Sequence, residues 1–324
     1  MTCVSNRQST ASAGTANDRI YLRIADVTYG MASVDPTMRF QVHEPVSRFQ
    51  VAESRPDVTI DARWDDLSVG EPKGAEVFHS GSVWRLAKNG GNYIFTLTSP
   101  AFGPVPYKVA RIKDDFSRGE VRIHRPYCEE SEGVYPLEYP LDELLMIHVL
   151  STGKGVEFHA TGVADSAGTK GTDGTNGNNR RGYLFVGQSG AGKTTMARLW
   201  ENRPGVTVLS DDRIVVRKID GRLWMYGTPW HGDAALSSPQ RVPLCGVFLL
   251  KHGPANALTA LKPVEAAGRL FSCGFFPFYD PSALQATLAV LEDLVSTVAC
   301  RELAFRPDDG VIEFVRAEGL TAGA

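Results

Sequence analysis

The chain has 324 residues, of which 43% are hydrophobic and 22% charged, and its formal net charge at pH 7 is −3. This is the composition of an ordinary globular protein that is long enough for two domains. A nearly neutral chain has no electrostatic basis for binding nucleic acid or an anionic membrane. No uninterrupted apolar stretch approaches the roughly 20 residues of a membrane-spanning helix. We therefore expect neither nucleic acid nor a membrane as a partner.

Residues 1–18, "MTCVSNRQSTASAGTAND", lack the apolar centre of a secretory signal, and their Ser, Thr, Ala and Gly content predicts a disordered tail. The five cysteines, at positions 3, 128, 245, 273 and 300, are widely spaced. They fit neither a zinc site nor a disulfide framework. We expect separate reduced thiols in a cytoplasmic protein.

Residues 19–135 are predicted to form a β-rich domain. Short alternating runs such as "RIYLRIADVTYGM", "VTIDARW" and "YKVARIKDD" are separated by Gly, Pro, Asn and Asp. The segment "AKNGGNY" has the composition of a tight hairpin turn. No residues in this region have catalytic spacing, so we expect it to pack, recognise or regulate.

Residues 136–324 are predicted to form the second domain. "PLDELLMIHVLS" has helical spacing, and it leads into "GVEFHATGV", a strand with His159 near its end. Residues 164–182 are almost purely Gly, Thr, Asn, Ser and Asp, which predicts a flexible loop between two strands of one core.

The motif G-x-x-x-x-G-K-T runs from Gly187 to Thr194, after the apolar run "YLFV". Its glycines let backbone N–H groups surround an anion, and the start of the following helix adds positive charge. Lys193 can reach the outer phosphates of a nucleotide, and the Thr194 hydroxyl can ligate Mg²⁺. The predicted nucleotide-binding residues are Gly187, Gln188, Ser189, Gly190, Ala191, Gly192, Lys193, Thr194 and Thr195.

After the loop and its helix, "VTVLS" predicts a buried strand that ends at Asp211 and Asp212. "RIVVRKIDGRLWMYG" predicts a hairpin, "VPLCGVFLLK" a buried strand and "ALQATLAVLEDLVST" an amphipathic helix. "CRELAFRPDDGVIEFVR" is expected to close the chain as a second hairpin, with its turn at Asp308 and Asp309.

The position of the acidic pair indicates the class of phosphate chemistry. Asp211 follows Lys193 by only 18 residues, much closer than the metal carboxylate of transporter and motor ATPases, and the N-K-x-D motif of small GTPases is absent. Two adjacent carboxylates can divide the work of a kinase, since one can hold Mg²⁺ and the other can accept the proton of an attacking hydroxyl.

The ordered segments "FHATGV", "YLFVGQSGAGKTT", "VLSDDRIVVR" and "GTPW" resemble the kinase domain of HPr kinase/phosphorylase and HPr-kinase-like proteins, and more distantly ATP-dependent phosphoenolpyruvate carboxykinase. The resemblance covers roughly residues 140–317. The segment that marks true HPr kinases downstream of the acidic pair is missing, so the likeness is to the HPr-kinase-like group. The resemblance implies that His159 lies in the active site, that Asp211 is the base and that Asp212 holds magnesium.

We therefore expect an α/β fold, with an HPr-kinase/carboxykinase-type P-loop domain preceded by the β-rich domain. The expected activity is ATP- and Mg²⁺-dependent transfer of phosphate to a hydroxyl, such as Ser or Thr of a peptide or protein. A small-molecule acceptor, a carboxykinase-like reaction and a nucleotide-responsive binding protein with little transfer are the alternatives. His231, Asp233, Arg241 and the turn at 227–230 are further polar candidates near the site. A homo-oligomer is compatible with the sequence.

Overall fold

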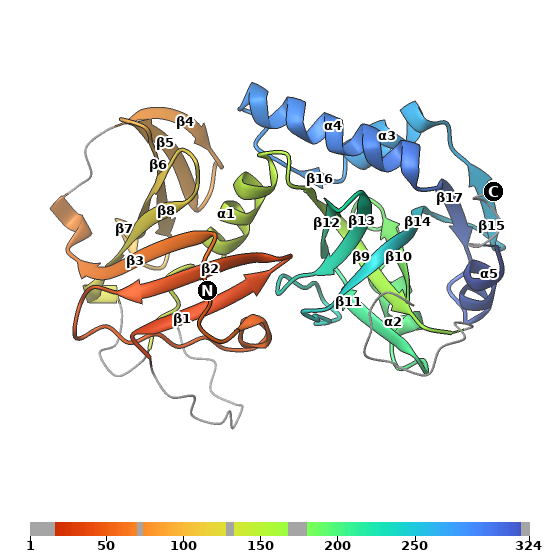
Figure 1. Ribbon diagram of the computed structural model, residues 1–324, viewed down its shortest axis with the longest axis horizontal. Coiled ribbons are helices and arrows are strands. Elements are labelled where there is room, and N and C mark those ends of the chain that lie inside the picture. Colours follow the sequence, from red (N-terminus) through yellow and green to blue (C-terminus); the bar gives the residue numbers. More distant parts are fainter. Residues whose placement is uncertain (1–16, 70–73, 128–132, 168–179, 319–324) are drawn as a thin grey trace. The chain divides into compact units, whose positions relative to one another are not determined.

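The computed structural model describes residues 17–69, 74–127, 133–167 and 180–318, and the chain divides into two compact units, residues 1–145 and 146–324 (Figure 1). The division falls within helix α1 (Leu141–Leu150), ten residues after the predicted boundary at 135/136. The content is mixed α/β, as predicted, and strands predominate.

Unit 1 is built on one eight-stranded sheet with the order β1-β2-β3-β8-β7-β6-β5-β4. The β2–β3 and β3–β8 pairs are parallel and the others antiparallel. Its strands are β1 (Arg19–Ile24), β2 (Val27–Ser33), β3 (Val58–Asp65), β4 (Ala75–His79), β5 (Trp84–Asn89), β6 (Asn92–Ser99), β7 (Gly103–Lys113) and β8 (Arg118–His124). The described part of unit 1 also has three short 3-10 helices: η1 (Val46–Phe49) and η2 (Leu67–Val69) between strands, and η3 (Arg125–Tyr127) directly after β8.

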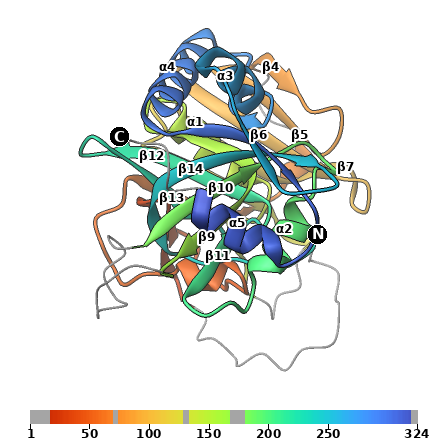
Figure 2. The same cartoon turned by 90° about the vertical axis from the view of Figure 1, so that its right-hand side faces the viewer.

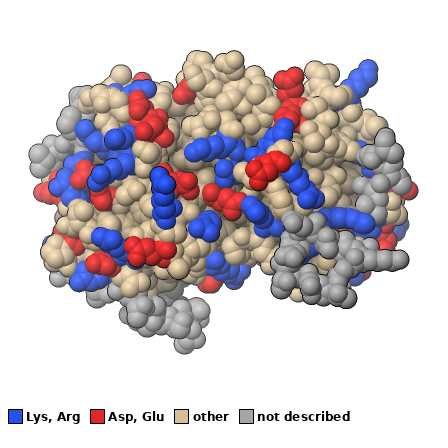
Figure 3. Space-filling view, viewed as in Figure 1, with Lys and Arg blue, Asp and Glu red and all other residues tan. Residues whose placement is uncertain are grey.

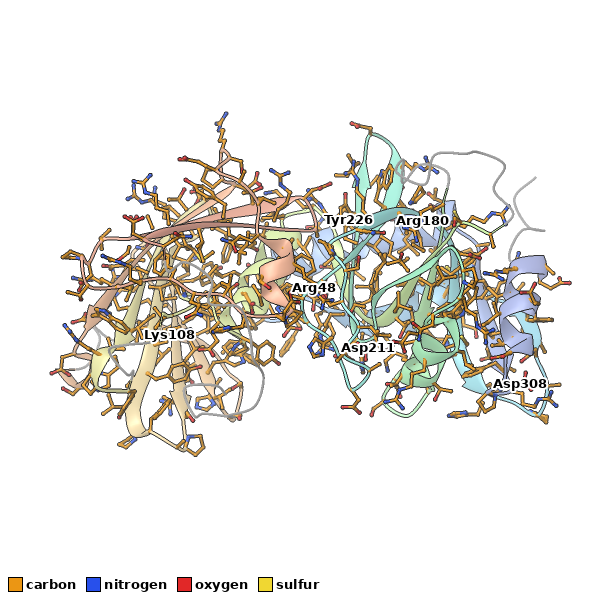
Figure 4. All side chains as sticks on the ribbon, turned by 90° about the horizontal axis from the view of Figure 1, so that it is seen from below. Arg48, Lys108, Arg180, Asp211, Tyr226 and Asp308 are labelled. Carbon is orange, nitrogen blue, oxygen red and sulfur yellow. The ribbon has the colours of Figure 1, made fainter. Side chains whose placement is uncertain are left out.

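The predicted tight hairpin of unit 1 is confirmed. Asn89 pairs with Asn92, and the two residues of the turn, Gly90 and Gly91, have φ angles of +54° and +75°. Two consecutive positive φ angles are the geometry of a hairpin turn that glycine adopts without strain. The one described lysine of unit 1 that is nearly inaccessible, Lys108 (2% exposed; Figure 4), donates to the backbone carbonyl of Tyr135 at 3.5 Å, so it has a structural role.

Unit 2 contains a nine-stranded sheet. Seven strands follow the order β10-β9-β12-β13-β14-β17-β15, and the other two, β11 and β16, pair with β9. Strand β10 also pairs with β14, in parallel. Its strands are β9 (Val156–Asp165), β10 (Arg181–Val186), β11 (Val206–Ser210), β12 (Arg213–Ile219), β13 (Arg222–Gly227), β14 (Arg241–His252), β15 (Ala257–Ala260), β16 (Gly274–Phe275) and β17 (Cys300–Phe305).

Helices cover both faces of this sheet. Helices α2 (Lys193–Trp200) and α5 (Gly310–Glu318) pack with β10, β14 and β17 in one apolar cluster, and they lie close together in Figure 2. Helices α3 (Pro263–Phe271) and α4 (Pro281–Thr297) pack on the other side, against β9, β12 and β14. Two separate cores therefore hold the central strands.

The structure corrects three sequence predictions. The chain closes with strand β17 followed by helix α5, so the predicted second hairpin over 300–316 is wrong, and the segment at Asp308 and Asp309 leads into the helix. His159 lies in the first half of β9, which continues to Asp165, rather than near the end of a strand. The loop between β9 and β10 is shorter than the predicted 164–182, and its residues 168–179 lie outside the described ones.

Of the predicted tail at residues 1–18, residues 1–16 lie outside the described ones, whereas the backbones of Asn17 and Asp18 hydrogen-bond to Phe40 and Ser33. No helix in the described ranges is long and apolar enough to cross a membrane. On the face drawn in Figure 3, basic and acidic side chains are interspersed, and no broad area of one sign is visible there. The described cysteines, Cys245, Cys273 and Cys300, are free thiols, as the sequence predicted.

Candidate functional site

A glycine-rich loop, residues 187–192, connects the carboxyl end of β10 to the first residue of α2. Strand β10 lies between β9, which is antiparallel to it, and β14, which is parallel. Val186 at the end of the strand is fully buried, whereas Gln188, Ser189 and Gly190 in the loop are exposed. The predicted strand–loop–helix arrangement is therefore present, with the loop open to solvent.

Two of the loop glycines are required by its geometry. Gly192 has a φ of +98°, and a Cβ atom there would lie 2.7 Å from a ring carbon of Phe305. A Cβ atom on Gly187 would lie 2.6 Å from that of Ala191. Gly190, with a φ of +82°, has open space around it, so only its backbone conformation favours glycine.

Lys193, the first residue of α2, reaches back over the loop. Its Nζ donates hydrogen bonds to the carbonyls of Gly187 at 2.8 Å and Gln188 at 3.1 Å, and the residue is only 6% exposed. Burial lowers the pKa of Lys193 below its ordinary value, although the nearby Asp212 opposes this. A buried ammonium at the start of a helix, surrounded by loop backbone, is a favourable position for an anion.

The two aspartates that follow β11 occupy different environments. Asp211 is 1% exposed, and its carboxylate accepts hydrogen bonds from the backbone N–H groups of Gly232 (3.0 Å), Ala234 (2.8 Å) and Leu236 (3.3 Å) (Figure 4). Both of its oxygens are therefore used in fixing the segment 232–236. This geometry does not favour the predicted role of Asp211 as a base, because proton acceptance would weaken three structural hydrogen bonds.

Asp212 is the more accessible carboxylate, with 26% of its side chain exposed. Its Oδ1 lies 2.9 Å from His159 Nε2, and its Oδ2 is paired with the guanidinium of Arg213. Burial raises the pKa of Asp212, but the hydrogen bond from His159 and the charges of Arg213, His159 and Lys193 outweigh it, so the pKa lies below its ordinary value. Asp212 is thus ionised at neutral pH.

A buried hydroxyl connects the loop helix to the acidic pair. Thr161 Oγ1 lies 3.1 Å from the carbonyl of Lys193 and 3.2 Å from that of Asp211. Thr161 and His159 are two residues apart on β9, so their side chains lie on the same face of the strand. This face therefore brings the histidine close to the acidic pair and the start of α2. The structure thus brings together the predicted residues His159, Lys193 and Asp212.

Thr194 and Thr195 differ in exposure. Thr194 is partly buried at the start of α2, and Thr195 is exposed. Among the described residues, no three His, Cys, Asp or Glu side chains gather into a site that could hold a metal by themselves. Mg²⁺ bound with a nucleotide takes most of its ligands from phosphates and water, and it prefers oxygen. The Thr194 hydroxyl and the Asp212 carboxylate are chemically suited to supply the remainder.

Three residues that contact the acidic pair or its neighbours, Arg213, Glu157 and Phe275, were not among the predicted site residues. Arg213 pairs with Asp212 and lies with its Nε 3.6 Å from Glu157 Oε1, and Glu157 is fully buried. A detectable signal was the two-residue alternation on β9, which puts Glu157, His159 and Thr161 on one face. The third neighbour, Phe275 on β16, comes from more than a hundred residues later in the chain and has no local signal.

The other polar candidates have mainly structural contacts. In the segment 227–230, Thr228 Oγ1 donates to the carbonyl of Arg213 at 2.7 Å, and Trp230 is 7% exposed, so this turn packs against β12. His231 and Asp233 are exposed. Arg241 at the start of β14 stacks over the ring of Trp224 at 4.7 Å.

The fold and this site define a mixed α/β protein with an exposed glycine-rich loop beside the contacting side chains of Asp212 and His159. No family model matches the chain, and no curated protein matches it.

Proposed function

We propose that unit 2 binds ATP with Mg²⁺ and transfers the terminal phosphoryl group to a hydroxyl, with Ser or Thr of a peptide or protein as the expected acceptor. The observation that carries the proposal is the contact of the Lys193 ammonium with the backbone of the glycine-rich loop. Beside it, Thr161 hydrogen-bonds to the carbonyls of Lys193 and Asp211, and Asp211 directly precedes the Asp212 that contacts His159. The resemblance to HPr-kinase-like proteins supplies the expectation of ATP and of a hydroxyl acceptor.

In this proposal the loop and Lys193 bind the β- and γ-phosphates. The ammonium exchanges its hydrogen bonds with the carbonyls of Gly187 and Gln188 for phosphate oxygens, which carry more negative charge. The loop N–H groups and the helix start add partial positive charge. Mg²⁺, when bound, would neutralise charge on the phosphates, and Thr194 and Asp212 would hold it.

We assign the proton to His159 rather than to Asp211. Imidazole is a poor ligand for Mg²⁺ but can accept a proton at neutral pH, whereas the Asp212 carboxylate suits the metal. As the hydroxyl oxygen forms its bond to the γ-phosphorus, the bond from phosphorus to the β–γ bridging oxygen breaks and its electron pair leaves with ADP. The hydroxyl proton passes to His159, and Asp212 stabilises the resulting charge.

The second candidate is a nucleotide-responsive binding protein. It is favoured by the engagement of Asp211 with the 232–236 backbone, because this leaves one accessible carboxylate where a kinase commonly uses two. In that case nucleotide binding would alter the surface of the protein without transfer.

The test combines binding and transfer. We expect Lys193→Ala to weaken MgATP binding at least tenfold, about 1.4 kcal/mol, by calorimetry, with an unchanged fold by circular dichroism. The matched control is Lys251→Ala, at an exposed side chain on β14. Equal affinity in wild type and Lys193→Ala would contradict the assignment.

Incubation with γ-labelled ATP, Mg²⁺ and a peptide library or cell extract then separates the candidates. Label on a protein or peptide supports the proposed kinase, and label on a small molecule identifies a small-molecule kinase. MgATP binding with no transfer to any acceptor favours the nucleotide-responsive protein.

A further inference from the structure

The cluster formed by Glu157, Arg213, Phe275 and Asp212 has a feature that the phosphoryl-transfer scheme does not use: one guanidinium lies between two carboxylates. The strand register produces this arrangement. Arg213 on β12 is directly opposite His159 on β9, and Phe275 on β16 is opposite Glu157. Residues opposite each other in antiparallel pairs have neighbouring side chains.

The two carboxylates differ in their access to solvent. Asp212 is partly exposed beside the glycine-rich loop, whereas Glu157 is fully buried behind Arg213. Arg213 is in ion-pair contact with Asp212, but its Nε is 3.6 Å from Glu157 Oε1, slightly longer than a hydrogen bond. The guanidinium is therefore closer to the accessible partner.

Phe275 gives the guanidinium a surface on which it can move. The guanidinium carbon lies 4.3 Å from the centre of the Phe275 ring. A planar guanidinium stacked on an aromatic ring can slide across it while keeping the cation–π contact. A shift of less than 1 Å toward Glu157 would make a normal hydrogen bond there.

We infer that, in the absence of Mg²⁺, the Arg213 guanidinium pairs with the Asp212 oxygen that would bind the metal. When Mg²⁺ binds there, the guanidinium moves to the Glu157 carboxylate. This inference rests on the proposed function. It follows from charge balance: a divalent cation at Asp212 repels the guanidinium, and the buried Glu157 carboxylate is the negative group placed to accept it. Metal binding and the Arg213–Asp212 pair are therefore in competition.

This competition predicts that substitutions of Arg213 and Glu157 change the Mg²⁺ dependence of ATP binding in opposite directions. Arg213→Met removes the competitor, so the Mg²⁺ concentration that half-saturates ATP binding should fall at least about fivefold. Glu157→Gln removes the receiving charge while keeping the side-chain shape, so the same concentration should rise by at least about fivefold. ATP binding in EDTA should change less than about twofold in either variant.

The experiment is calorimetric titration of ATP into the full chain at a series of Mg²⁺ concentrations. Because Arg213→Met leaves a buried carboxylate and can fail to fold, the double variant Glu157→Gln/Arg213→Met, which removes both charges, is measured beside it and should also bind Mg²⁺ more tightly than wild type. The matched control is Arg217→Met on the same strand, whose guanidinium donates to the carbonyl of Lys154, and no change is expected.

A second measurement is a crystal structure with MgADP. The Arg213 Nε to Glu157 Oε1 distance should shorten to hydrogen-bond length, and the Arg213–Asp212 contact should open. If the variants all weaken Mg²⁺ binding, or none changes it, the pair is only structural and the inference is overturned while the proposed function stands. If wild type binds no MgATP, the proposed function fails and the inference fails with it.

Discussion

The Asp211→Asn substitution tests whether the Asp211 carboxylate has a structural or a catalytic role. In the wild type, Oδ2 accepts from Ala234 and Oδ1 from Gly232 and Leu236, all backbone N–H groups. An amide offers one oxygen and one NH₂ group, so whichever way it turns, at least one of these partly buried N–H groups faces another donor. An unsatisfied buried donor costs about 1–3 kcal/mol, and the remaining bonds lose the strength that a charged acceptor gives.

We therefore expect Asp211→Asn to lower the free energy of unfolding of unit 2 by about 2–4 kcal/mol. For a domain of this size, that corresponds to a fall in melting temperature of roughly 5–12 °C. The assay is differential scanning calorimetry together with urea titration. The matched control is Asp212→Asn, a partly exposed neighbour, for which we expect a loss of less than about 1 kcal/mol.

The opposite pattern would refute this reasoning. If Asp211→Asn is as stable as wild type and binds MgATP normally, but transfers phosphate roughly 10²–10⁴ times more slowly, then Asp211 takes the proton, as the sequence analysis predicted. The hydrogen bonds to segment 232–236 would in that case be incidental.

Three further predictions concern the loop and the helices around it. Gly192→Ala should destabilise by about 2 kcal/mol or more, because it combines a positive φ with a contact at 2.7 Å, whereas Gly190→Ala, in open space, should cost only about 1 kcal/mol by urea titration. Arg316→Ala should lower the free energy of unfolding by about 3 kcal/mol in the same assay, because Arg316 donates two hydrogen bonds (2.9 and 3.1 Å) to the fully buried Asp165 on β9. A loss below about 1 kcal/mol would contradict this. Because burial lowers the pKa of Lys193 in the folded state, the unfolded chain binds more protons just below pH 10.5, and the stability of wild type relative to Lys193→Met should rise as pH increases toward 10.5; an unfolding series at alkaline pH checks the sign.

The parts of the site that local sequence determines were predictable. The strand, glycine-rich loop and helix around Gly187–Lys193 depend on neighbouring residues, and each is present. The difference between Asp211 and Asp212 was not predictable, because it depends on which carboxylate meets the backbone of residues some twenty positions later. Adjacent identical side chains carry no local signal for that choice.

The error over 300–316 has a related cause. "GVIEFVR" is rich in β-branched and aromatic residues, which favour a strand. The burial of Val311, Ile312 and Val315 at helical spacing against α2 and the sheet overrides that preference. Asp308 then accepts a hydrogen bond from the N–H of Gly310 at 3.0 Å, which starts the helix instead of turning a hairpin (Figure 4).

Strand β9 pairs with β10, β11, β12 and β16, and it also carries Glu157, His159 and Thr161. Its backbone amides are thus closed off by partners on both edges, and amide exchange along this strand should require opening of the whole of unit 2. The site residues on β9 should therefore not unfold locally while the rest of unit 2 stays folded. Heating should leave the site competent until unit 2 melts, so residual ligand binding and the folded fraction would follow a single curve.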